Sequence, residues 1–245
     1  MLFSVLNKVT TFGGQIVLAW YLVPSDLGLV ALATSVTSLL SVISVASLGD
    51  TIVQEKDDAK FRRDFGQIFW ICNSINFALA GLCMLAAPWI GRAYHQPQLT
   101  PLLILIEVNA IFVGLSLAYG TALKRSLRFK TLAVIFFVSG TIQSVVSVVM
   151  ACKGFGAYSI IIPLALSSLV GLVLQFKAAG PMPIGRPQPR LWLGHLAPSF
   201  WLLFMTILPA LQTQGTSFVM GFSQDTEQIG LFFWGYSLAN QVVFL

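Results

Sequence analysis

The chain has 245 residues, of which 56% are hydrophobic and 9% are charged. Soluble domains carry about 25% charged residues, so this composition excludes an ordinary soluble fold and indicates an integral membrane protein. The formal net charge of +5 does not indicate nucleic-acid binding, because the cations lie in the short gaps between apolar runs and form no basic face.

Eight apolar runs follow one another along the chain, and a helix needs roughly 20 such residues to cross the bilayer core. We expect spans over residues 2–23, 27–48, 65–90, 102–123, 131–152, 155–176 and 199–222, and an eighth from 229 to the last residue. A tight turn at Pro24-Ser25-Asp26 separates the first two spans, since Pro ends a helix and Ser or Asp caps the next. The sequence therefore predicts an all-α, polytopic membrane bundle.

The loop at residues 124–130 sets the predicted orientation of every span. It carries four cations, which are poorly translocated and therefore mark a cytoplasmic loop: Lys124, Arg125, Arg128 and Lys130. If the loops then alternate sides, only Arg92 and Lys153 fall on the outer side, while Lys8 lies within the first span. We predict a cytoplasmic N-terminus, and we expect the four cations to set topology and to contact membrane lipids.

The loops and cysteines argue against an enzyme. The longest loop, residues 177–198, is too short for a soluble catalytic domain, so the protein acts within the bilayer or at its surface. Cys72, Cys83 and Cys152 form no CxxC pair and have no His at metal-ligand spacing. We expect no cofactor, no metal and no catalytic residue.

A short internal repeat links the second and eighth spans. Leu27-Gly28-Leu29-Val30 opens one span and Ile229-Gly230-Leu231-Phe232 opens the other, each after a polar turn on the same predicted side. Parallel repeats of six spans are a known transporter architecture. The pattern therefore favours a transporter built from two repeated lobes.

Five motifs resemble a known family and occur in its order along nearly the whole chain. They are Leu22-Val23-Pro24-Ser25-Asp26-Leu27-Gly28, Asp50-Thr51-Ile52-Val53-Gln54-Glu55-Lys56, Leu127-Arg128-Phe129-Lys130, Gly154-Phe155-Gly156-Ala157-Tyr158, and Ile229-Gly230-Leu231-Phe232 with Tyr236-Ser237-Leu238-Ala239. The chain resembles the Wzx-type lipid-linked oligosaccharide flippases of the multidrug/oligosaccharidyl-lipid/polysaccharide exporter superfamily. The chain departs from the family pattern at one place outside these motifs. Ala19-Trp20-Tyr21 stands where many relatives carry a cation near the end of the first span.

The resemblance implies a transporter of 12 to 14 spans, of which this chain would be a fragment. Residues 1–178 would form the first lobe, 179–198 a cytoplasmic linker and 199–245 the start of the second lobe. The expected activity is flipping of an isoprenoid-pyrophosphate-linked oligosaccharide, such as an O-antigen, capsule or exopolysaccharide unit, across the bacterial inner membrane by alternating access. The expected partners are that lipid-linked oligosaccharide and the membrane lipids.

The first span carries one polar stripe, because Asn7, Thr11 and Gln15 recur every four residues with Lys8 beside them. Polar groups inside a span usually face a bundle interior or a hydrated cavity. Lys8 is our candidate for attracting the pyrophosphate; the alternative is that it snorkels to the cytoplasmic interface.

Two further groups are candidates. Glu107 is the single acid within a span, and it is either a coupling site for a proton or cation or a hydrogen-bonded packing residue. The seventh and eighth spans offer uncharged groups that would bind sugar hydroxyls or, alternatively, hydrogen-bond neighbouring helices: Gln212, Gln214, Thr216, Tyr236 and Asn240.

Three rival functions stay open at this point. A cation-coupled drug or metabolite antiporter of the same superfamily should carry acids deep in the first lobe, where only Glu107 qualifies, and that residue is off centre. A membrane glycosyltransferase or polymerase needs a loop carboxylate, and the outer loops hold only Asp26, Asp225 and Glu227. A scaffold without transport activity would leave no signature in the sequence.

Overall fold

The structure is a computed structural model that describes residues 2–44, 58–180, 185–187, 208, 211–212, 215–216, 218–220 and 225–243. For residues 2–9, 11–12, 39–44, 58–64, 238 and 240–243 it describes the backbone alone. The described chain forms the helices α1 (Leu2–Tyr21), α2 (Pro24–Ser44), α4 (Asp58–Ala93), α5 (Leu99–Arg125), α6 (Phe129–Cys152), α7 (Tyr158–Ala179) and α9 (Thr226–Val243).

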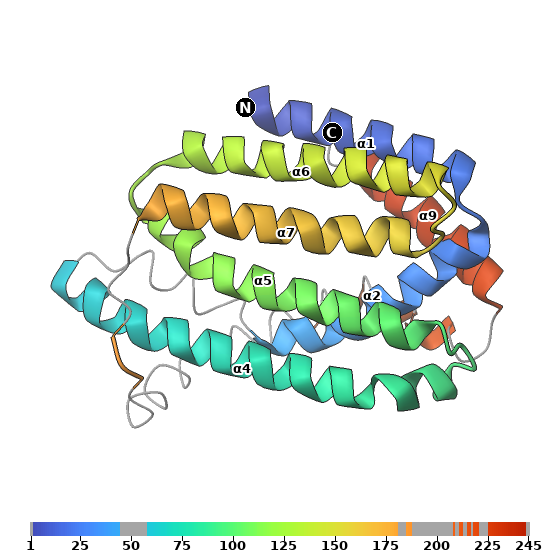
Figure 1. The fold of residues 1–245 in the computed structure, drawn as a ribbon, viewed down its shortest axis with the longest axis horizontal. Coiled ribbons are helices and arrows are strands. Elements are labelled where there is room, and N and C mark those ends of the chain that lie inside the picture. Colours follow the sequence, from blue (N-terminus) through green and yellow to red (C-terminus); the bar gives the residue numbers. More distant parts are fainter. Residues whose placement is uncertain are drawn as a thin grey trace.

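Five of these helices lie side by side in one row. The order across the row is α4, α5, α7, α6, α1, and each helix packs on the next (Figure 1). Helix α2 packs against α5 and α4, and α9 packs against α2. The row therefore does not follow the chain order, because α7 lies between α5 and α6.

The helices confirm the predicted all-α membrane bundle. Four of the described helices are long and apolar enough to cross a membrane, and they coincide with the predicted third to sixth spans: Phe65–Ala93, Leu99–Arg125, Phe129–Cys152 and Tyr158–Ala179. Helices α1, α2 and α9 occupy the predicted first, second and eighth spans. Most of the predicted seventh span, and the motif at residues 50–56, lie outside the described residues.

The predicted turn at Pro24-Ser25-Asp26 is wrong, because the chain turns two residues earlier. Helix α2 begins at Pro24, and the non-helical connection is Leu22 and Val23. Pro is well suited to the first position of a helix, because its missing N–H has no partner there anyway and its φ is already helical. Asp26 therefore lies in the first turn, where its charge favours the positive end of the helix dipole.

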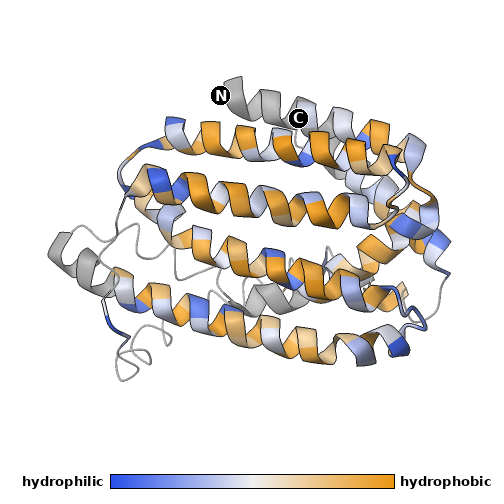
Figure 2. Ribbon diagram, viewed as in Figure 1, coloured by the Kyte–Doolittle hydropathy of each residue, from blue (hydrophilic) through white to orange (hydrophobic). Residues whose placement is uncertain are grey.

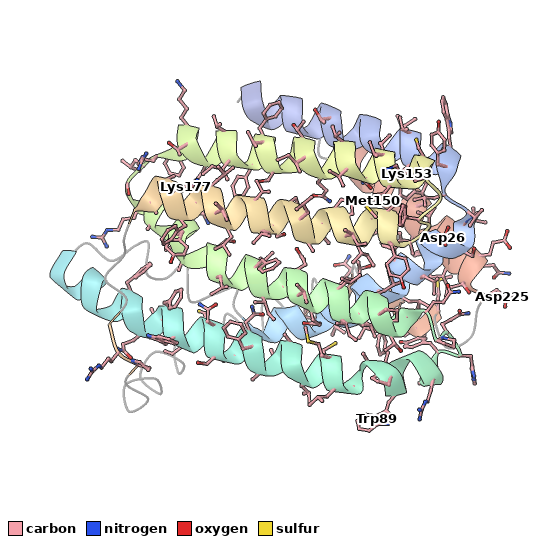
Figure 3. All side chains as sticks on the ribbon, viewed as in Figure 1. Asp26, Trp89, Met150, Lys153, Lys177 and Asp225 are labelled. Atoms are coloured by element: carbon pink, nitrogen blue, oxygen red, sulfur yellow. The ribbon has the colours of Figure 1, made fainter. Side chains whose placement is uncertain are left out.

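The ends of the bundle differ in composition from its middle. Polar residues gather at the helix ends and apolar residues fill the middle of the row (Figure 2). We call the end that carries Asp26, Lys153 and Asp225 the outer end and the end that carries Lys177 the inner end, following the predicted orientation (Figure 3). At the outer end Trp20 and Trp89 are 81% and 68% exposed, as expected for the aromatic belt at a membrane interface.

Hydrogen bonds between helices hold the row together. Ser168 on α7 donates to the side-chain oxygen of Asn109 on α5, and Asn76 on α4 donates to the Ala110 carbonyl at 2.9 Å. Ser167 on α7 donates to Gln143 on α6 at 3.3 Å. These bonds cross the α4–α5, α5–α7 and α6–α7 contacts, so polar side chains connect four of the five helices in the row.

Candidate functional site at the outer end

The outer ends of α2 and α9 touch through two glycines. A methyl group added to Gly28 would overlap the Thr226 carbonyl, and one added to Gly230 would overlap the Pro24 carbonyl. The added methyl at Gly230 would also lie 2.8 Å from the Gly28 nitrogen. The two backbones therefore meet directly, which small residues permit at membrane helix crossings.

This crossing has the form of a pseudo-symmetric contact. Pro24 stands four residues before Gly28, and Thr226 stands four residues before Gly230. Each glycine faces the carbonyl at the start of the opposite helix. A contact in which equivalent positions face one another is what a two-fold relation produces. The repeat seen in the sequence is thus a contact in space.

Side chains from the α4–α5 loop extend this contact. The Gln96 amide donates a hydrogen bond to the Thr226 hydroxyl at 3.1 Å. The Tyr94 hydroxyl donates to the Phe218 carbonyl at 3.3 Å, and their rings meet edge to face at 6.3 Å between centroids. Burial raises the pKa of Tyr94 to about 12, so this hydroxyl keeps its proton and its donor role at neutral pH.

The α6–α7 turn completes the outer end. Gly154 and Gly156 have φ of 77° and 54°, a left-handed conformation that favours glycine. The Asp26 carboxylate lies against this turn, since a methyl group on Gly156 would come within 2.9 Å of its Oδ1. Figure 3 shows Asp26 and Lys153 at this end.

An apolar cluster lies beside the glycine crossing. It joins the end of α1 to α2 and α6 through Leu18, Leu22, Leu27 and Ala151, and Trp234 of α9 packs against it. With the glycine crossing and the bond from Gln96, α9 therefore meets α2, the α4–α5 loop and this cluster at the outer end. We call this set of contacts the outer junction: Pro24–Gly28, Tyr94–Gln96, Gly154–Gly156, Phe218 and Thr226–Gly230, with Trp234.

The outer junction collects three of the five family-like motifs. The motifs at residues 22–28, 154–158 and 229–232 meet there, although up to about 200 residues separate them in the chain. The basic motif at residues 127–130 lies at the inner end, between α5 and α6.

The structure adds hydroxyl groups on α2 that the sequence analysis did not single out. Thr34, Ser35, Thr37 and Ser38 follow the glycine crossing toward the inner end. Each donates to a carbonyl one turn back in the same helix, at 2.8 to 3.1 Å. Their oxygens keep acceptor capacity after this donation, and such bonds often bend a helix. The signal in the sequence was the run Thr-Ser-Val-Thr-Ser within an apolar span.

The predicted substrate-binding residues are placed only in part. Asn7, Lys8 and Thr11 belong to α1 and Asn240 to α9, but their side chains, and all of Gln214, lie outside the described residues. Gln15 is half-buried in α1, and Gln212 and Thr216 are exposed. Tyr236 is 40% exposed, and its ring stacks on Phe232 of the same helix at 6.1 Å. Their roles in binding substrate stay predictions.

Glu107 packs between α5 and α4. It is buried on α5, and its carboxylate lies within hydrogen-bonding distance of the Cys83 thiol on α4. The carboxylate therefore faces a neighbouring helix of the same row. Its role as a coupling site stays a prediction.

Comparison with known proteins identifies relatives over most of the chain. Residues 17–245 match the family described as polysaccharide biosynthesis protein. The succinoglycan biosynthesis transport protein ExoT of Rhizobium meliloti (strain 1021) is 31% identical over 69% of this chain and 35% of its own length. The amylovoran biosynthesis protein AmsL of Erwinia amylovora is 24% identical over 74% of this chain and 47% of its own length. The chain thus spans less than half of these relatives, and no solved structure matches it.

Proposed function

Because this chain belongs to the polysaccharide biosynthesis protein family, we propose that it forms part of a transporter for a polysaccharide unit. In the finer form of the proposal, the substrate is an isoprenoid-pyrophosphate-linked oligosaccharide, and the protein flips it across the bacterial inner membrane. Two relatives support this, since one is named for transport in succinoglycan biosynthesis and the other for amylovoran biosynthesis. These names also favour a transport protein over an enzyme.

The chemistry of such a substrate defines what the protein must supply. The sugars and the pyrophosphate need a hydrated path, whereas the isoprenoid chain stays in the bilayer. A cavity between two lobes provides that path, and Lys8 is our candidate for attracting the pyrophosphate as a point charge. The uncharged groups of the later spans, and the half-buried Thr34 and Ser38 of α2, would then bind sugars without a strong charge preference.

The outer junction is the observation that carries the proposal. Alternating access requires that the substrate path open to one side at a time. In this structure the outer ends of α2 and α9 are in backbone contact. In our proposal this contact closes the path to the outside, and the transporter accepts its substrate from the cytoplasmic leaflet.

The contacts of the outer junction suit a gate that opens. Gly28 and Gly230 interlock no large side chain at the crossing itself. The two loop contacts are single neutral hydrogen bonds, from Gln96 and Tyr94, each worth a net ~1 kcal/mol. Parting α2 from α9 breaks these two weak hydrogen bonds and also separates Ile229 and Trp234 of α9 from their apolar neighbours.

A reversible cross-link tests this mechanism in the full-length protein. Gln96→Cys and Thr226→Cys place two thiols across the outer junction, where the Gln96 amide nitrogen lies 3.1 Å from the Thr226 hydroxyl. A short, reducible bifunctional thiol reagent can replace the length of the Gln96 side chain. Cross-linking should stop glycan export in cells that lack the native transporter, and a reducing agent should restore it. The background should carry Ser at Cys72, Cys83 and Cys152, the native cysteines.

A second cysteine pair provides the matched control. Asn109→Cys and Ser168→Cys join α5 to α7 within the first lobe. If the first lobe moves as a rigid body, the protein should export glycan normally with this link in place. Normal export with the Gln96–Thr226 link formed would refute opening at the outer junction, and an equal loss with both links would show only damage to the fold.

The antiporter alternative gains no support from Glu107. Its carboxylate packs against Cys83 between two helices of the first lobe, away from the contact with α9. We therefore keep the flippase as the proposed function.

A further inference from the structure

An open groove lies at the inner end of the row, between the start of α6 and the end of α7. Lys130, Thr131 and Val134 line it from α6, and Leu174, Lys177 and Ala178 line it from α7. Its volume is about 490 Å³, within the ~300–1,000 Å³ typical of sites for small molecules. We call it the α6–α7 groove.

The mouth of the groove is basic. Lys130 and Lys177 are both exposed, and neither ammonium has a hydrogen-bond or ion-pair partner among the described side chains. Arg128 lies beside them, where its guanidinium donates to the Ala178 carbonyl at 2.6 Å. That bond satisfies a carbonyl at the negative end of the α7 dipole. It also holds a third positive charge, the Arg128 guanidinium, next to the groove.

No described carboxylate balances these charges. The acids whose side chains are described are Asp26, Asp225 and Glu227 at the outer end and Glu107 within α5. Figure 3 shows Asp26 and Asp225 at the end of the bundle opposite Lys177. The mouth of the groove therefore suits an anion.

The floor of the groove is apolar. Val134 and Leu174 lie about one helical turn deeper than Lys130 and Lys177, and Ile135 also lines the groove. Leu174 and Ala178 pack against the buried cluster of Leu123, Leu132 and Ile135, so the floor is fixed by the core of the lobe. The groove thus places cations at its mouth and hydrocarbon below them.

We propose that the α6–α7 groove binds one anionic phospholipid of the cytoplasmic leaflet. The headgroup phosphate lies between Lys130 and Lys177, and one acyl chain runs along Val134 and Leu174. Basic pockets between helices on the cytoplasmic side are known to bind such headgroups. The predicted orientation puts the groove in that leaflet, where anionic phospholipids are resident ligands. The inference does not depend on which glycan is transported.

Binding of phosphatidylglycerol tests the site. The probe is full-length protein in phosphatidylcholine nanodiscs that contain a small fraction of labelled phosphatidylglycerol. We expect Lys130→Gln with Lys177→Gln to weaken phosphatidylglycerol binding by about 25-fold, from about fivefold per cation near a membrane surface. Arg92→Gln with Lys153→Gln removes the same charge at the outer end, where the second leaflet of the nanodisc also holds phosphatidylglycerol, and should bind as the wild type does.

A steric variant separates a groove from a charged surface. Val134→Trp keeps both lysines but fills the apolar floor, so it should also reduce phosphatidylglycerol binding at least fivefold. The elution volume and the unfolding temperature of this variant should stay those of the wild type. Equal weakening by the two charge pairs, with no effect of Val134→Trp, would show general attraction to an anionic surface and overturn the proposal. Displacement of phosphatidylglycerol by an equimolar isoprenyl pyrophosphate would assign the groove to the transported lipid instead, and would also overturn it.

Discussion

The α2–α9 contact and the α5–α7 contact are both tight, but they are built from different groups. At α2–α9 two glycine backbones touch, and beside them Gln96 of the α4–α5 loop donates a part-buried hydrogen bond to Thr226. At α5–α7, Ser168 bonds Asn109, and the Gln175 side chain lies against Gly120. The first contact joins the two predicted lobes, and the second lies within one. Polar side chains bond the α5–α7 contact, whereas the α2–α9 contact depends on close backbone approach and apolar packing, which one larger side chain would disrupt.

The largest expected effect comes from filling the glycine crossing. Gly28→Leu puts a side chain where the Thr226 carbonyl now lies, so the outer ends of α2 and α9 cannot meet. We expect glycan export by the full-length protein to fall at least tenfold, with an increase in thiol labelling of a cysteine placed at Gln96.

The matched control is Gly235→Leu on α9, an exposed position where an added methyl group meets nothing within 4 Å. It should export within about twofold of the wild type, since it leaves the crossing intact. If Gly28→Leu exports as well as Gly235→Leu does, the crossing is not a gate.

A smaller effect is expected within the lobe, and on stability instead of export. Asn109→Ala removes the acceptor of the Ser168 hydroxyl, and interhelical bonds in membranes are worth about 0.6 to 1.7 kcal/mol. The free energy of unfolding in detergent should fall by about 1 kcal/mol, while export per folded molecule stays unchanged. A double-mutant cycle with Ser168→Ala should show coupling; additive losses would mean that the bond contributes nothing.

The smallest effect should come from the polar edge of the outer junction. Thr226→Val removes the acceptor of the Gln96 amide without changing the shape of the side chain. One such hydrogen bond is worth ~1 kcal/mol, so the population of molecules with the outer junction open should rise about fivefold. Thiol labelling at the outer end measures that population, and an unchanged labelling rate would place the closing energy in the glycine and Trp234 contacts alone.

The sequence by itself determined the elements of the bundle. The predicted spans at residues 65–90, 102–123, 131–152 and 155–176 agree with α4 to α7 within a few residues at most ends. Apolar length is a local property, because a helix in a bilayer must satisfy its own backbone over a fixed thickness. Helix ends are less local: α4 begins at Asp58, before the apolar run, and α2 begins at the Pro that we expected to be a turn.

Only the tertiary structure decided which faces meet. The sequence showed that residues 27–30 and 229–232 repeat, but not that Gly28 and Gly230 touch. It showed Glu107 as a lone acid within a span, but not that Cys83 faces it, and it showed the cations 124–130 without the groove that Lys130 shares with Lys177. A spanning helix is apolar on every side, since lipid and lobe interior are both hydrocarbon-like, so its periodicity does not mark the face that packs. Those pairings depend on the shapes of helices that are distant in the chain.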